Sequence, residues 1–68
     1  MKNIIKSILG FKGVSVSELA ERLGKSTANM SQQLSRDDFR ESDLQAIANA
    51  LDCELVIKFI DRETGKEF

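Results

Sequence analysis

The strongest constraint on the fold is a helix end followed almost at once by a helix start, near the middle of the chain. Gly24 comes directly after an apolar helical pattern that ends at Leu23. Glycine adopts the left-handed backbone conformation past a helix end at little cost. Ser26, two residues later, is of a type that caps helix N-termini well. The sequence therefore predicts two helices joined by a very tight turn.

The spacing of apolar residues predicts four helices. They are expected at about 3–11, 16–23, 27–35 and 41–51, where apolar residues recur three or four positions apart. In the first helix the residues at helical spacing are Ile4, Ile5, Ile8, Leu9 and Phe11. Met30 and Leu34 share one face of the third helix, and the residues of the fourth that are expected to face inward are Leu44, Ile47, Ala48 and Leu51. A mostly α-helical domain is the expected fold class.

Polar residues at the expected helix starts support these boundaries. Ser15 can cap the second helix, and Glu18 is expected to return a hydrogen bond to the Ser15 backbone. Glu41 and Asp43 lie in the first turn of the fourth helix, where negative charge suits the helix dipole. Phe39 is expected to anchor the loop before that helix.

The pattern changes after Cys53 to residues typical of strands. The segment LVIKFI is rich in β-branched and aromatic residues, and Thr64 and Gly65 supply turn chemistry. We therefore expect a C-terminal β-hairpin over about 54–68. The residues of its first strand expected to face the helices are Leu55, Ile57 and Phe59.

This first strand would be apolar on both faces, because side chains alternate along a strand. Pairing with the same strand of a second copy would hide the exposed edge, so a homodimer is expected. The residues expected at the dimer interface are Val56, Lys58 and Ile60. The alternative is a hairpin folded back on its own monomer, with the edge covered by Phe68 and charged side chains.

Length and composition bound the remaining possibilities. A chain of 68 residues holds a single domain with a modest core, in which a large active-site cleft is improbable. The lone cysteine, Cys53, cannot form an internal disulfide, and a reducing cytoplasm fits best. No apolar run approaches the roughly 20 residues that span a bilayer, and no cleavable export signal is evident. We expect a cytoplasmic protein without membrane contact.

Charge is distributed unevenly along the chain. Residues 1–36 contain six lysines and arginines against two glutamates, a net charge of +4, whereas residues 37–68 carry a net charge of −5. The first part could face an anionic polymer while the second is repelled by it. Chance clustering explains the charge pattern equally well on its own.

Enzymatic function has little support in the sequence. There is no histidine and no glycine-rich loop to hold phosphate. Cys53 fits a small buried apolar residue better than a nucleophile. Asp37 and Asp38 have no third carboxylate at a suitable spacing for a metal site, so they fit a loop and cap role. No cofactor, metal or small-molecule ligand is expected.

The helices on either side of Gly24 contain residues suited to packing against each other. A small residue, Ala20, allows the third helix to approach the second closely. Leu19, Leu23 and Met30 are expected to pack between these two helices. These features predict a helix-turn-helix whose third helix projects outward. The segment SVSELAERLGKSTANMSQQL resembles the lambda-repressor-like, Cro-like family of bacterial and phage regulators, with the similarity spanning residues 3–52.

The sequence departs from that family at Lys25 and Gln33, where apolar residues are usual. The resemblance implies double-stranded DNA as the partner, a role as a transcriptional regulator, and dimerisation through the C-terminal strand. A repressor is the expected form.

The resemblance also implies which residues meet DNA, because the third helix of such proteins enters the major groove. The residues expected to contact bases are Thr27, Ala28, Asn29, Ser31 and Gln32. Gln32 is the strongest candidate, since its amide can pair with adenine through two hydrogen bonds. The residues expected to contact phosphates are Val16 and Ser17, through backbone amides, and Lys25, Ser26, Ser35 and Arg36.

One rival interpretation stays open at this point. The same fold could serve as a protein-interaction adaptor, such as an antirepressor or an antitoxin-like protein. The acidic overall balance and the lack of an arginine inside the third helix favour it, because arginine to guanine is the commonest specific base contact.

Overall fold

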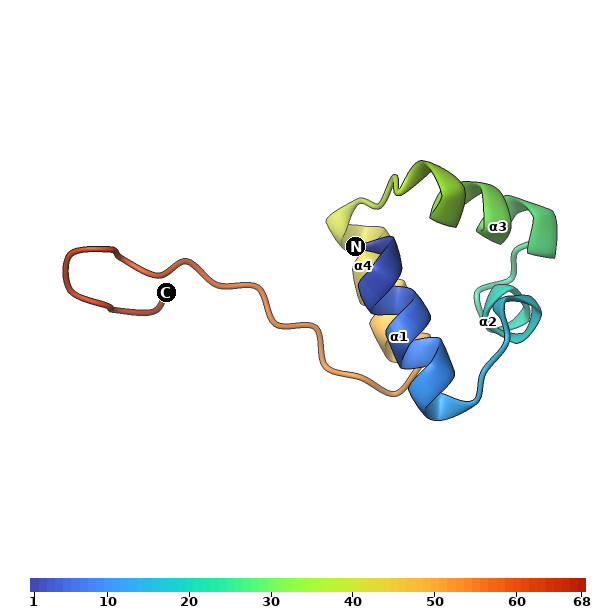
Figure 1. Cartoon of the computed structure of the whole chain (residues 1–68), viewed down its shortest axis with the longest axis horizontal. Helices are drawn as coiled ribbons and strands as arrows, with labels where there is room; N and C mark the ends of the chain where they lie inside the picture. The colour runs from blue at the N-terminus through green and yellow to red at the C-terminus, as the bar shows by residue number, and fades with distance from the viewer.

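Four helices form the body of the molecule, and the C-terminal segment runs away from them (Figure 1). The computed structural model describes all 68 residues. The helices are α1 (Lys2–Lys12), α2 (Val16–Arg22), α3 (Thr27–Arg36) and α4 (Glu41–Ala50). Their ends differ from the expected ones by one residue at most. None of the four is long and apolar enough to span a membrane.

All four helical segments contribute to one apolar core. Its members are Ile5, Leu9, Leu19, Ala20, Met30, Leu34, Ile47 and Leu51. The partly buried residues packed against it include Val14, Leu23, Phe39, Leu44 and Cys53. Burial of this apolar surface is the main favourable contribution to folding in a domain of this size. The inward faces predicted for α3 and α4 are confirmed.

Two apolar residues of α1 lie outside the core. Phe11 and Ile4, which belong to the spacing pattern that predicted this helix, are 89% and 58% exposed. Successive residues turn by about 100° around a helix, so only a narrow stripe of a short helix can meet the core. That stripe passes through Ile5 and Leu9, and the other two apolar residues fall beside it.

The capping predictions hold at two helix starts, with one correction. The Oγ of Ser15 accepts a hydrogen bond from the Glu18 backbone N–H at 3.1 Å, and the Oγ of Ser26 accepts one from Asn29 at 3.1 Å. The reciprocal bond expected from the Glu18 carboxylate is absent. That carboxylate accepts a hydrogen bond from Arg22 at 3.2 Å instead, because the two side chains are neighbours one helical turn apart.

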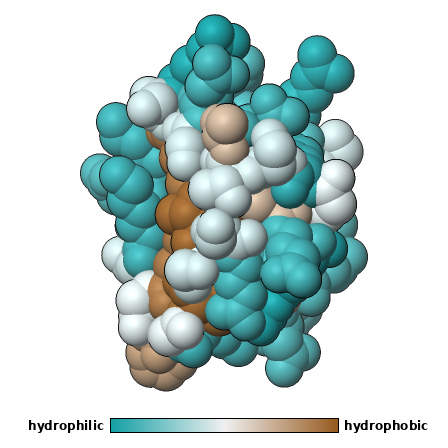
Figure 2. Space-filling model, turned by 90° about the vertical axis from the view of Figure 1, so that its right-hand side faces the viewer, coloured by the Kyte–Doolittle hydropathy of each residue, from teal (hydrophilic) through white to brown (hydrophobic).

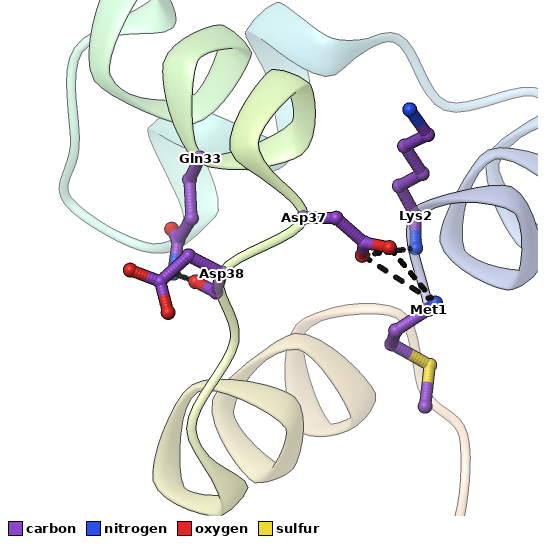
Figure 3. Close-up of polar contacts among 5 residues, drawn as sticks. All are labelled: Met1, Lys2, Gln33, Asp37 and Asp38. Atoms are coloured by element: carbon purple, nitrogen blue, oxygen red, sulfur yellow. Dashed lines mark hydrogen bonds and ion pairs between the residues drawn. The ribbon is translucent and has the colours of Figure 1, made fainter.

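Asp37 ties the end of α3 to the beginning of α1. It takes the left-handed conformation just past α3, with φ of 52°. Its carboxylate accepts a hydrogen bond from the Lys2 backbone N–H at 2.8 Å and lies 3.4 Å from the N-terminal ammonium of Met1 (Figure 3). The bond from the Lys2 N–H lowers the pKa of Asp37 below its ordinary value of 3.8, and the ammonium acts in the same direction. A residue 35 positions away thus caps α1.

The expected β-hairpin over 54–68 is wrong. Residues 54–58 form no backbone hydrogen bond, and pairing is limited to an isolated antiparallel bridge between Ile60 and Glu67, beyond which Gly65 turns the chain. Ile57 and Phe59, expected to face the helices, are exposed, and Leu55 is only half-buried. A short hairpin of its own buries too little surface to hold a strand pair together in water.

Candidate nucleic-acid interface

The two helices that flank Gly24 meet at a steep angle. In Figure 1, α2 is seen nearly end-on while α3 lies across the view. Leu19 and Met30, one on each helix, have no exposed surface where the helices pack, and Ala20 is buried beside them. Gly24 has a φ of 70°, and the N–H of Lys25 donates back to the Ala20 carbonyl at 2.8 Å. The predicted helix-turn-helix is therefore present.

One face of α3 is buried and the opposite face is open to solvent. Met30 and Leu34 point into the core, which fixes the register of the helix. Gln32 follows Met30 by two residues, or about 200° around the helix, so it points away from the body together with Ala28 one turn earlier. All five residues predicted to contact bases are exposed: Thr27, Ala28, Asn29, Ser31 and Gln32.

The surface at this end of the molecule is mainly polar. Figure 2 views the side on which α2 and α3 lie, and hydrophilic or neutral residues cover most of it, apart from a narrow hydrophobic strip. The sequence of α3, TANMSQQLSR, contains no acidic residue. The exposed face of α3 therefore offers hydrogen-bonding groups and has no acidic side chain of its own.

A pair of hydroxyl groups joins the beginnings of α2 and α3. The Oγ of Ser17 and the Oγ1 of Thr27 lie 2.9 Å apart, within hydrogen-bonding distance. The backbone N–H groups of Val16 and Ser17 donate no hydrogen bond within the chain, as expected for the first turn of a helix. Four groups that can bind an anion or a base edge thus lie on neighbouring helix starts.

The two departures from the family pattern bind each other. The Nζ of Lys25 donates to the Oε1 of Gln33 at 2.9 Å, and the Nε2 of Gln33 donates to the Asp38 carbonyl at 3.2 Å. Gln33 therefore joins the turn before α3 to the loop after it. Figure 3 shows this amide next to Asp38, with Asp37 turned toward α1 on the other side. A polar connection replaces the apolar contacts that are usual at these positions.

A polar groove of about 330 Å³ runs along this side of α3. The residues that line it are Lys25, Asn29, Gln32, Gln33, Arg36, Asp38, Arg40 and Asp43. The sequence-based predictions missed Arg40, which precedes α4 and whose backbone N–H donates to Asp43 at 2.9 Å. Its place before an acidic helix start gave no sign that it would join Lys25 and Arg36 in space.

A second groove, of about 260 Å³, lies on the other side of α3. Its lining residues are Lys2, Lys6, Val16, Ser31, Leu34 and Ser35. The predicted phosphate contacts are therefore divided: Ser35 and Val16 lie in this groove, and Lys25 and Arg36 in the first. Ser26 lies at the start of α3, where its oxygen is used as a cap. The two lysines of α1 were not predicted as site residues.

No group of three or more His, Cys, Asp or Glu side chains comes together to hold a metal ion. Cys53 is a free, half-buried cysteine packed against the core. The chemistry that this surface offers is hydrogen bonding and positive charge around one projecting helix.

Comparison with known proteins agrees with this geometry. A family model described as a Cro/C1-type HTH DNA-binding domain matches residues 4–56, from the first turn of α1 into the segment after α4. No curated protein and no solved structure matches the chain. The matched region includes α2, the turn at Gly24 and α3. The chain belongs to the family of Cro/C1-type helix-turn-helix DNA-binding domains.

Proposed function

We propose that this protein is a transcriptional repressor that binds a specific double-stranded DNA sequence as a homodimer. The observation that carries the proposal is the open, acid-free face of α3 on the helix-turn-helix of a DNA-binding family. A helix with its side chains is about 10–12 Å across, which matches the roughly 12 Å width of the major groove.

Base readout is assigned to the outward side of α3. The Gln32 side chain can form two hydrogen bonds with adenine. Its amide N–H donates to adenine N7, and its carbonyl oxygen accepts from the N6 amino group. Ala28, one turn earlier on the same side, offers an apolar contact to a thymine methyl group. Asn29 and Ser31 lie on either side of this line, and Thr27 lies at the helix start next to Ser17.

Phosphate contacts position the domain without reading sequence. Lys25 and Arg36 supply positive charge on one side of α3, and Ser35 supplies a hydroxyl on the other. Val16 and Ser17 contribute backbone N–H groups that have no partner in the chain, and Ser26 can still donate its hydroxyl proton. Arg40 joins this set because it lines the same groove as Arg36.

Dimerisation through the C-terminal segment supports binding to a near-palindromic site. Residues 54–58 leave their backbone groups unpaired, and Val56 and Ile60 are 66% and 57% exposed. Antiparallel pairing with the same segment of a second copy would satisfy those groups and bury Val56 and Ile60, with Lys58 between them at the interface. Two α3 helices would then enter successive major grooves about 34 Å apart.

Occupation of such a site blocks access of other proteins, which is the simplest route to repression and requires no catalytic group. The proposed site of action is the cytoplasm, as the resemblance to bacterial and phage regulators implies.

The proposal is tested by selecting bound sequences from a pool of random duplexes. We expect a near-palindromic motif for the wild type. Replacing Gln32 by alanine should change the base preference at one position of each half-site. The matched control is Gln45→Ala, which removes an exposed glutamine of α4 that bonds Asn49. A selected motif that is identical for the wild type and Gln32→Ala would reject the readout assigned to this residue.

A protein-interaction adaptor remains the second candidate, favoured by the exposed apolar side chains after α4. The two functions differ in their response to salt. Binding to DNA weakens steeply as salt is added, because neutralised phosphates release counterions. An adaptor would not bind duplex DNA even at low salt and would form a stable complex with another protein.

A further inference from the structure

The two grooves that flank α3 carry positive charge on opposite sides of the helix. One is lined by three cations, Lys25, Arg36 and Arg40, which outnumber its two acids, Asp38 and Asp43. The other is lined by Lys2 and Lys6 of α1. A helix lying in the major groove has one phosphate backbone on each side of it. The positive charges on the two sides of α3 are therefore complementary to the negative charges of the two phosphate backbones of duplex DNA.

Lys2 and Lys6 lie one turn apart on α1, on the side that faces α3. They share their groove with Ser31 and Ser35, which lie one turn apart on α3. The groove thus has two cations on one wall and two hydroxyl groups on the other. Both kinds of group are common donors to phosphate oxygens in protein–DNA complexes.

The side chains of Lys2 and Lys6 form no ion pair within the chain, although the molecule has three ion pairs. The nearby carboxylate of Asp37 is occupied by the N-terminal ammonium and by the backbone N–H of Lys2. Figure 3 shows the Lys2 side chain extending away from that carboxylate. The residues that line the groove include no acid.

We propose that Lys2 and Lys6 form a second phosphate-binding edge, so that α3 is held in the groove by contacts to both DNA strands. This inference rests on the proposed binding of duplex DNA. Lys25, Arg36 and Arg40 hold the backbone on one side of α3, and the two lysines of α1 hold the backbone on the other. Asp37 is a positioning residue for this edge, because it fixes the first turn of α1 against the end of α3.

The experiment measures duplex binding as a function of salt concentration. The probe is a duplex of about 21 base pairs of random sequence, two turns of DNA, since phosphate contacts do not depend on sequence. The variant is Lys2→Gln with Lys6→Gln. The matched control is Lys12→Gln with Lys66→Gln, which changes the net charge equally but affects lysines outside both grooves. Far-UV circular dichroism checks that each variant is folded.

We expect the variant to lower the slope of log K against log salt concentration by about 1.8 per bound protomer, because each phosphate contact contributes about 0.9. The control should keep the wild-type slope, and Lys2→Arg with Lys6→Arg should restore it. A wild-type slope in the glutamine variant, or an equal decrease in the control, would overturn the second edge while leaving the proposed function intact. Failure of the wild type to bind any duplex would overturn both.

Discussion

The helical body and the C-terminal tail are both rich in apolar residues, yet only one of them is packed. All nine buried residues lie between Ile5 and Leu51. The tail, residues 54–68, contains five of the eight large hydrophobic residues that remain exposed: Val56, Ile57, Phe59, Ile60 and Phe68. The two regions differ in whether their apolar side chains find packing partners within the chain. Apolar residues of the body share faces that meet inside one chain, whereas the tail is apolar on both faces and none of its residues is fully buried.

The largest effect should come from shortening a core side chain of the body. Leu19→Ala removes a fully buried side chain between α2 and α3 and should lower the free energy of unfolding by about 2–5 kcal/mol. That loss is a large part of the total stability of a small domain. In dilute samples, below the concentration at which chains associate, Phe59→Ala should cost less than about 0.5 kcal/mol. Urea unfolding followed by circular dichroism measures both.

A similar cost for the two substitutions under those conditions would show that the tail is packed on its own body. The contrast between the two regions would then be lost.

The next effect concerns association rather than folding. Val56→Glu places a charge within the proposed strand pair, at a position that pairing would bury, where burial of an unpaired charge is unfavourable. We expect sedimentation equilibrium to give the mass of a monomer, with an unchanged helical signal. Gln45→Glu adds the same charge on the exposed side of α4 and should leave a dimer. A dimeric mass for Val56→Glu would remove the proposal of strand pairing.

A smaller effect should separate the body from the tail in DNA binding. Arg36→Gln and Arg40→Gln each remove a cation from the groove beside α3. Each should weaken binding to all sequences similarly and lower the salt slope by about 0.9 per protomer. Arg62→Gln makes the same change in the tail and should leave the slope as it is. If Arg62→Gln reduced the slope as much as Arg36→Gln, the tail itself would be a DNA-binding element.

The smallest effect is a difference in pH dependence between two aspartates. Hydrogen bonds lower the pKa of Asp37, through the Lys2 backbone N–H, and that of Asp61, through the Thr64 side chain. A folded-state pKa below the ordinary value of 3.8 gives stability that is present above that value and is lost as the pH falls through the folded pKa. Only Asp37 joins elements of the body.

Unfolding of the helices measured from about pH 5 to about pH 2 should therefore become less dependent on pH in Asp37→Asn and stay as in the wild type in Asp61→Asn. An altered pH profile in Asp61→Asn would show that the turn of the tail is coupled to the folding of the body.

Local signals were enough to predict the body. Ser15, Gly24 and Ser26 act on neighbouring residues, so helix starts and the tight turn could be placed within one residue. The register of α3 followed from Met30 and Leu34, and with it the exposure of Gln32. The DNA contacts assigned to that face stay predictions.

The tail and the edges of the site could not be predicted in the same way. Leu55, Ile57 and Phe59 have the composition of a strand, but a strand exists only when a second one supplies its hydrogen bonds. Arg40, Lys2 and Lys6 reach the sides of α3 only because the helices pack as they do, and no spacing along the chain shows this.

The amino-acid sequence alone determined the four helices, the caps of α2 and α3 and the bend at Gly24, because these depend on residues within one or two helical turns of each other. The tertiary structure decided which cations surround α3 and that Asp37 caps α1 from 35 positions away. It also decided that residues 54–58 stay unpaired and that the tail pairs only around Ile60 and Glu67. Those outcomes depend on contacts between distant segments, whose free energy is set by packing in three dimensions.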